Sequence, residues 1–234
     1  PGCAFRTTLF RMEMMNLETL IKRNRSAFTP LFDPPLDAGN TVYMELSSSN
    51  NEFDGLSQAR QDAAILERIA AAGAIAGVGG YLEDRSVYRD TELFQGDAER
   101  SIHIGVDVFM PAGTSLYAPL DGVVHSFANR RVQGDYGPVI ILRHRLEGIE
   151  FHTLYGHLSE DSLEGLADGK PIVAGERIAA IGARPGNGDW APHLHFQLIH
   201  DMQGKRGDYP GVVRPQELDF FRENCPDPGD LLLT

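Results

Sequence analysis

The chain has 234 residues, of which 42% are apolar, and a formal net charge of −12 from 21 basic and 33 acidic residues. This size and composition suit one large domain, or one domain with an appendage, around a buried core. The acidic balance argues against nucleic acid as a partner, because phosphate binding needs a basic face. The sequence contains no run of eighteen apolar residues and so predicts no membrane span, while the oligomeric state stays open.

The N-terminal residues bear on where the protein resides. They carry no methionine at position 1 and no long apolar stretch, so they do not form an intact secretory signal. Together with the acidic charge this favours the cytoplasm, whereas an export segment already removed would place the protein in the periplasm or outside the cell. The two cysteines, Cys3 and Cys225, lie at opposite ends of the chain and are expected to be free thiols.

Residues 1–80 are expected to form an N-terminal α/β appendage without a chemical motif. Residues 13–25 have helix-forming composition with a basic end, which suits a helix C-terminus. Residues 28–40 are proline-rich and predict an extended linker, and residues 41–47 alternate like a short strand. Whether this appendage covers a site in the following domain is left open.

The clearest helix of the appendage is predicted over residues 57–72. Ser57 or Asp54 is a candidate N-cap, because a short side chain with an oxygen can accept from the free N–H groups of the first turn. An apolar stripe is expected to face the core. Its members are Ala63, Leu66, Ile69 and Ala70.

Residues 81–234 change in character and predict a mainly β domain with a C-terminal tail. Short β-like runs are separated by glycine and proline, a pattern typical of an all-β sandwich or open barrel. The runs are SIHIGVDVFM, SLYAPLDGVVHSFA, GPVIILRHRL, EFHTLYGHLS, ERIAAIGA and PHLHFQLIH.

All eight histidines of the chain lie in this second region, and the first local pattern among them is His103-Ile-Gly-Val-Asp107. Residues four apart on a strand share a face, so both side chains could reach one metal ion, and Gly105 between them leaves room for it. An imidazole nitrogen and a carboxylate oxygen are ordinary zinc ligands. Two solvated side chains on a strand are the alternative.

The second pattern is His193-Leu-His195, in a strand whose intervening residues are apolar. The two histidines share a face, while Leu194 and Phe196 point into the core. Spacing alone does not decide which of the two histidines would bind a metal. A half-exposed strand with two polar residues is the alternative, although the apolar neighbours suggest buried histidines that need partners.

The third pattern is Thr153-Leu-Tyr-Gly-His157, where a histidine ends a strand at a glycine. Such a histidine can reach a site without being held in a strand ladder, and a surface histidine is the alternative. Together the three patterns supply three metal ligands and two spare histidines. Catalytic zinc usually takes three protein ligands and a water whose pKa it lowers to ~7, and a neighbouring histidine can move the proton.

In chain order, HIGVD, PAGTSLYAPLDGVV, GDYGPVIILRHR, TLYGHLS, IAAIG and PHLHFQL resemble the lysostaphin and LytM type of zinc metallopeptidases. The resemblance runs from about Ser101 to about Ile199. It implies a small antiparallel β barrel or sandwich with a groove over the metal. It also implies a zinc endopeptidase that cleaves peptide cross-links of peptidoglycan, often at glycine.

The resemblance assigns roles to five residues. His103, Asp107 and His195 match the three zinc ligands, and His157 and His193 match the two catalytic histidines. Tyr136, Tyr155 and Trp190 are candidates for contacts with substrate, with plain packing as the alternative for each.

Two departures from the family pattern stand out. The usual HLHFE ends as HLHFQ, with Gln197 expected to orient neighbouring groups without binding zinc. The loop 182–192 carries Asp189 and Trp190 in place of a short Ser/Thr-Gly turn, which bears on substrate preference.

The flanks GYLEDRSVYRDTELF and GDYPGVVRPQEL suggest a second resemblance, to the peptidase-like middle domain of bacterial fusion proteins with a phosphotransferase and a class III aminotransferase. Two alternatives to a cell-wall endopeptidase therefore stand: an intracellular zinc hydrolase of a small amide or metabolite, and a non-catalytic binding module of the same fold.

Overall fold

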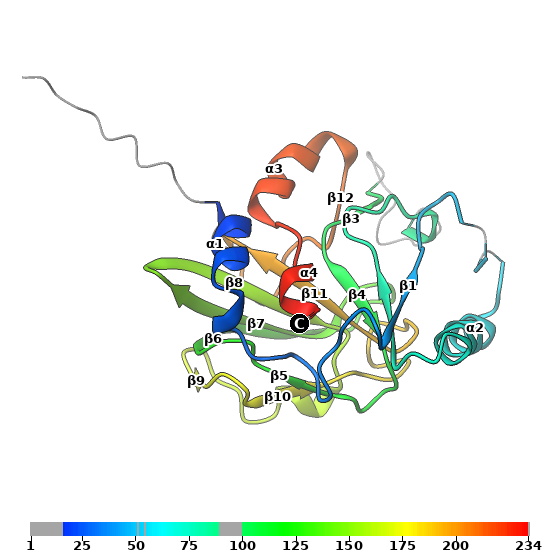
Figure 1. Cartoon of the computed structure of the whole chain (residues 1–234), viewed down its shortest axis with the longest axis horizontal. Helices are drawn as coiled ribbons and strands as arrows, with labels where there is room; N and C mark the ends of the chain where they lie inside the picture. The colour runs from blue at the N-terminus through cyan, green and yellow to red at the C-terminus, as the bar shows by residue number, and fades with distance from the viewer. Residues whose placement is uncertain (1–15, 51, 54, 89–99, 234) are drawn as a thin grey trace, which may run out of the picture.

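The computed structural model describes residues 16–50, 52–53, 55–88 and 100–233, which form mainly β structure around one eight-stranded sheet (Figure 1). The strands of this sheet, in spatial order, are β1 (Thr41–Met44), β2 (Ala76–Gly79), β4 (Val106–Phe109), β11 (His193–Ile199), β8 (Ile149–Gly156), β7 (Gly137–Leu146), β6 (Gly122–Arg130) and β9 (Pro171–Ile172). The mainly β prediction is confirmed, as an open sheet with β1 and β9 at its edges.

Two small ribbons and four α-helices complete the fold of the described residues. The ribbons pair β5 (Ser115–Tyr117) with β10 (Arg177–Ala180) and β3 (Ile102–His103) with β12 (Val212–Val213). The helices are α1 (Leu17–Arg23), α2 (Gln58–Ala71), α3 (Leu218–Asn224) and α4 (Gly229–Leu232). Among the residues that the structure places, no helix has the length and apolar character to cross a membrane.

The central strands are buried on both faces. Along β7, Ile140 and Leu142 contribute to one apolar cluster, whereas Val139 and Ile141 contribute to a second. This follows from the strand's period of two, because successive side chains point to opposite faces. The sheet therefore has a core on each side, which explains why residues 137–142 of β7 are all apolar and buried.

Strand β11 separates the core from the site. Leu194, Phe196 and Leu198 point into the larger apolar cluster, as the alternation predicts. His193 and His195 lie on the opposite face of the strand and are also buried, with 5% and 2% of their surface exposed. The strand is thus anchored by apolar side chains on one face and presents both histidines on the other.

The N-terminal region contributes two strands to the same sheet. β1 and β2 pair in parallel, and β2 pairs antiparallel with β4, so the sheet continues from the N-terminal residues into the histidine-bearing strands. Helix α2 lies beside β1 and β2 at this edge (Figure 1). A domain boundary near residue 80 stays a prediction.

Helix α2 forms where expected, but its buried face differs from the predicted stripe. Leu66 is 51% exposed, and the buried residues are Ile65 and Ile69. These two pack with Met44 and Phe109, because the position of the sheet edge and not the helix pattern alone selects the buried face. Ser57 occupies the N-cap without a side-chain capping bond, and Asp54 lies outside the described residues.

The segment predicted as one strand over SIHIGVDVFM is divided. His103 ends β3, which pairs with β12, whereas Asp107 lies in β4, which pairs with β11. The side chains of His103 and Asp107 still converge. They do so because the chain changes direction at Ile104 and Gly105, between two strands, and not because they share a face of one strand.

Candidate metal centre

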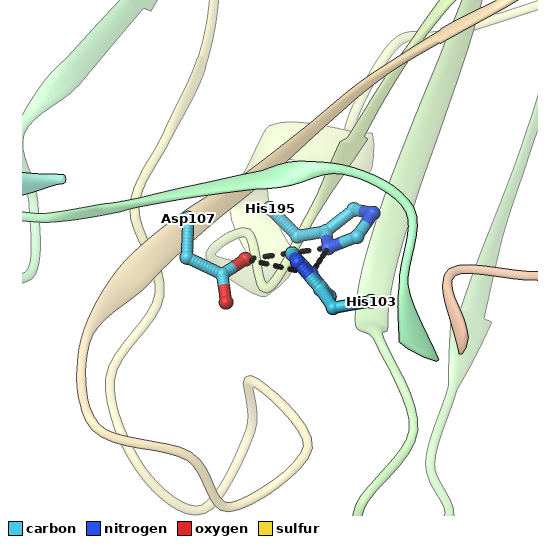
Figure 2. A group of neighbouring side chains, drawn as sticks. All are labelled: His103, Asp107 and His195. Atoms are coloured by element: carbon cyan, nitrogen blue, oxygen red, sulfur yellow. Dashed lines mark hydrogen bonds and ion pairs between the residues drawn. The ribbon is translucent and has the colours of Figure 1, made fainter. Parts of the chain in front are cut away.

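Three side chains converge on one point, as Figure 2 shows for His103, Asp107 and His195. Asp107 and His195 come from neighbouring strands of the large sheet, and His103 comes from the β3–β12 ribbon. His195 lies directly opposite Asp107 in the β4–β11 register. Nε2 of His103 is 2.8 Å from Nδ1 of His195, and Oδ1 of Asp107 is 3.3 Å from each of these nitrogens. All three side chains are buried.

This donor set fits a tetrahedral zinc ion. Ligand atoms that lie about 2.0–2.1 Å from zinc at tetrahedral angles are about 3.3 Å from one another, close to the spacings found here. Oδ1 of Asp107 is buried without a hydrogen-bond partner among the described residues. A buried carboxylate oxygen without a partner is costly, and a bound cation would satisfy it.

The electrostatics of the site keep Asp107 and His103 in the forms that a metal requires. Burial alone would raise the pKa of Asp107, but His103 and Arg85 hold it well below its usual value, so the carboxylate is ionised. Burial, with Arg85 adding to it, lowers the pKa of His103 to about 3, which leaves its imidazole neutral. An ionised carboxylate and neutral imidazoles are the species that bind zinc.

Gly105 is required for the approach of His195. A Cβ at this position would lie 2.6 Å from Cε1 of His195 and 2.8 Å from the carbonyl oxygen of Phe196. The glycine thus makes room for the imidazole ring of His195. The sequence pattern predicted room for the metal ion instead.

Gly105→Ala is therefore expected to lower the free energy of unfolding by about 1–3 kcal/mol through overpacking, with displacement of His195. Urea denaturation measures this loss. Gly186→Ala is the matched control, because an added Cβ there meets nothing closer than 3.8 Å and its φ is not positive. Equal stability of the two variants would contradict the close approach at Gly105.

His157 and His193 form a second pair beside the three ligand groups, with ring centroids 4.2 Å apart. Nδ1 of His157 is 2.9 Å from the carbonyl oxygen of Asn187, and Nδ1 of His193 is 2.6 Å from that of Ala191. A carbonyl only accepts, so each Nδ1 donates and each Nε2 carries the lone pair. Burial lowers the pKa of both histidines, which keeps them neutral and able to accept a proton.

Gln197 fixes the tautomer of His195. Its Oε1 is 3.0 Å from Nε2 of His195, while its Nε2 donates to the carbonyl oxygen of Pro210 and to Sγ of Cys225. The amide oxygen therefore accepts from Nε2–H of His195, and Nδ1 presents its lone pair toward His103 and Asp107. An amide suits this position because a carboxylate has no hydrogen to give to Pro210.

Gln197→Leu is expected to weaken zinc binding about 10–100-fold, because the variant loses the acceptor that orients His195. Gln197→Glu keeps an acceptor and should retain most of the affinity. Competition titration against a chelating dye measures both constants. Unchanged affinity in Gln197→Leu would show that His195 needs no such support.

Arg85 is the main site residue that sequence analysis did not identify. Its Nη1 is 2.5 Å from Oδ2 of Asp107, and its Nε and Nη2 contact Glu83 at 3.0 and 2.9 Å. Burial alone would lower the pKa of Arg85, but Tyr88, Asp107 and Glu83 together raise it, so the guanidinium is charged. The charged pair within GYLEDRSVY was the available signal, but nothing in the sequence placed it beside Asp107.

A cavity of about 710 Å³ lies over these groups, and all five predicted ligand and catalytic residues line it. Tyr136 and Trp190 line it too; the ring of Tyr136 packs edge-on against His195, and its hydroxyl donates to the carbonyl oxygen of Tyr209. Tyr155 differs, since it is fully buried against Phe196 in the larger core and is not part of the cavity lining. Tyr155 is therefore a packing residue of the core, which was the alternative to a contact with substrate.

The N-terminal region also reaches this cavity. Leu46 and Ile65 line it on the side of β1 and α2. The described part of residues 1–80 therefore supplies a wall of the cavity. The sequence alone did not decide whether these residues cover the site. His144 and His152, by contrast, lie outside the lining: His144 bonds Thr153 within the fold, and the ring of His152 packs edge-on against His125.

Residues 101–208 match the model of peptidase family M23. This match confirms the lysostaphin and LytM type inferred from the order of the motifs. Glu83 and Arg85 lie before the matched segment, as do the N-terminal strands of the sheet.

Two curated relatives are similar to part of the chain. The chain is 38% identical over 96 residues to an uncharacterized metalloprotease of Haemophilus influenzae, covering 41% of this chain and 18% of that protein. It is 35% identical over 97 residues to the peptidoglycan DD-endopeptidase ShyA of Vibrio cholerae, covering 42% of this chain and 20% of the relative. The chain thus spans about a fifth of the length of these relatives.

Among solved structures, the catalytic domain of the antimicrobial peptidase lysostaphin from Staphylococcus simulans is similar at 25% identity and a TM-score of 0.36. The match covers 55% of this chain and 86% of that domain.

Proposed function

We propose that this chain is a zinc metallopeptidase that hydrolyses a peptide amide bond in peptidoglycan-type peptides. The observation that carries the proposal is Oδ1 of Asp107, which has no hydrogen-bond partner within the described part of the chain and lies 3.3 Å from Nε2 of His103 and Nδ1 of His195. The match of residues 101–208 to the model of a peptidase family supports the reaction class. The name of the Vibrio cholerae relative supports the substrate class.

His103, Asp107 and His195 would hold the zinc ion in this proposal. Bound zinc would supply a water acidified toward a pKa of ~7 and would polarise the scissile carbonyl. The protein's own contribution is to keep the three donor atoms within 3.3 Å of one another before any ion binds.

His157 and His193 are proposed to move the proton. Each ring is fixed by its Nδ1–H bond to a backbone carbonyl, so the free Nε2 can accept a proton from the attacking water and return it to the leaving amine. The second ring stays neutral meanwhile, and its Nε2 can accept a hydrogen bond that orients the attacking water. Their close packing makes simultaneous protonation unfavourable, which suits a division of roles.

Tyr136 and Trp190 are proposed to contact the substrate, since both line the cavity beside these histidines. A second candidate function, hydrolysis of a small amide, is favoured by one observation. The cavity volume of about 710 Å³ lies within the range of small-molecule sites, and N-terminal residues outside the family segment form part of its wall.

One substrate panel distinguishes these functions. Zinc-loaded protein is incubated with purified peptidoglycan, glycine-rich peptides and small amides, and new amino groups are measured. We expect release from peptidoglycan or its peptides, loss of this activity after chelation, and recovery on addition of zinc. Hydrolysis of small amides alone would favour the second function, and no hydrolysis by zinc-loaded protein would contradict both.

A further inference from the structure

We infer that Arg85 is a positioning residue for the metal centre, which holds one oxygen of Asp107 so that only the other faces the metal. The inference rests on the zinc site proposed above. It concerns a residue outside the segment 101–208 that matches the peptidase family.

The two oxygens of Asp107 have separate surroundings. Oδ2 accepts from Nη1 of Arg85 at 2.5 Å, whereas Oδ1 lies 3.3 Å from the facing nitrogens of His103 and His195. Oδ1 has no hydrogen-bond partner among the described residues. A carboxylate held in this way can offer a metal a single oxygen, which suits a three-ligand site with one position left for water.

Arg85 is itself fixed by buried partners. Its Nε and Nη2 both contact Oε2 of Glu83, and Nη1 also lies 3.2 Å from the hydroxyl of Tyr88. Glu83 in turn accepts from the hydroxyl of Tyr43 at 2.8 Å through Oε1. The side chains of Arg85 and Glu83 are only 3% and 7% exposed, so the planar guanidinium has little freedom to turn.

Strand β2 and the residue after it leave space for this network. A Cβ at Gly79 would lie 3.1 Å from Nη2 of Arg85, and a Cβ at Gly80 would lie 2.8 Å from Oε1 of Glu83. The N-terminal extension of the sheet therefore accommodates both the arginine and its counterion beside β4, which carries Asp107.

The charges indicate orientation as the role of Arg85. A lone arginine beside a metal site would repel the cation, but Glu83 offsets that charge. Glu83, Arg85 and Asp107 together sum to one negative charge, which is the charge of Asp107 alone. What Arg85 adds is a directed donor that fixes the carboxylate plane, as residues that support metal ligands do elsewhere.

The test compares wild type with the double variant Glu83→Gln/Arg85→Met, which removes the donor but keeps the summed charge. Zinc affinity is measured by competition titration, and the visible spectrum of the Co²⁺-loaded protein reports how the ligands are arranged. Arg85→Lys is the second variant, since it keeps the charge but lacks the planar fork. Arg143→Met, at an exposed arginine on β7, is the matched control.

We expect the double variant to bind zinc about 10–100-fold more weakly, with an altered cobalt spectrum, while Arg143→Met matches wild type. Circular dichroism establishes folding, and if the double variant does not fold, Arg85→Lys is judged by the same two measurements. Wild-type affinity together with a wild-type cobalt spectrum in the folded variant would overturn the role of Arg85 alone. Failure of wild type to bind either metal would overturn the zinc site and this inference together.

Discussion

His157→Ala is expected to lower the rate of peptide hydrolysis about 10²–10⁴-fold while zinc stays bound, because a positioned proton-transfer group contributes a factor of this size. His157 lines the cavity, and its ring packs beside that of His193. It is not among the three residues whose ligand atoms converge. Steady-state kinetics and metal content, measured on the same preparation, test both parts.

The control for this variant is His152→Ala. His152 is also a buried histidine on the segment that leads to residue 157, but it packs against His125 and is not part of the cavity lining. We expect this variant to keep its rate and its zinc. Wild-type hydrolysis by His157→Ala, or loss of its zinc, would show that the proposed role is wrong.

His195→Ala is expected to weaken zinc binding by more than the ~10–100-fold that loss of a supporting residue costs, because it removes a donor atom itself. Nδ1 of His195 lies 2.8 Å from Nε2 of His103 and 3.3 Å from Oδ1 of Asp107. Hydrolysis should be lost together with the metal. Isothermal titration with zinc measures the affinity.

His193→Ala is the natural comparison, two residues away on the same strand and the same face. Nε2 of His193 is 3.7 Å from Oδ1 of Asp107, farther than either proposed nitrogen ligand, and its Nδ1 faces the carbonyl oxygen of Ala191. We expect this variant to keep its zinc and to lose rate. If His193→Ala lost zinc and His195→Ala kept it, the two roles would have to be exchanged.

Much of this site could be predicted from sequence because β11 follows a simple rule. Leu194 and Phe196 had to enter the core, so His193 and His195 had to share the opposite face. The sequence could not say which histidine is closer to Asp107. That choice depends on the register of β11 against β4, which sets His195 opposite Asp107.

Other features depend on packing between distant segments, and local patterns do not report them. The break between His103 and Asp107 arises because β3 pairs with β12 while β4 pairs with β11, and β12 is more than one hundred residues away along the chain. The buried face of α2 differs from the prediction for a similar reason. The edge of the sheet packs against Ile65 and leaves Leu66 exposed. The contact of Arg85 with Asp107 also joins segments that sequence spacing does not relate.

The place of the N-terminal residues also required the structure. Strands β1 and β2 extend the sheet that carries Asp107 and His195, two of the proposed metal ligands, and Leu46 and Ile65 help to line the cavity. A segment without a chemical motif thus shapes the site that the histidine motifs define. Its contribution should appear in substrate preference, because it borders the cavity without contacting the three ligand atoms.

The most direct test of this account is the zinc content of the wild-type protein. The protein is purified without chelators, incubated with excess zinc, dialysed and measured by inductively coupled plasma mass spectrometry. We expect one zinc ion per chain, lost in His195→Ala and kept in His157→Ala. A wild-type protein that retains no zinc after this treatment would contradict the proposed metal centre.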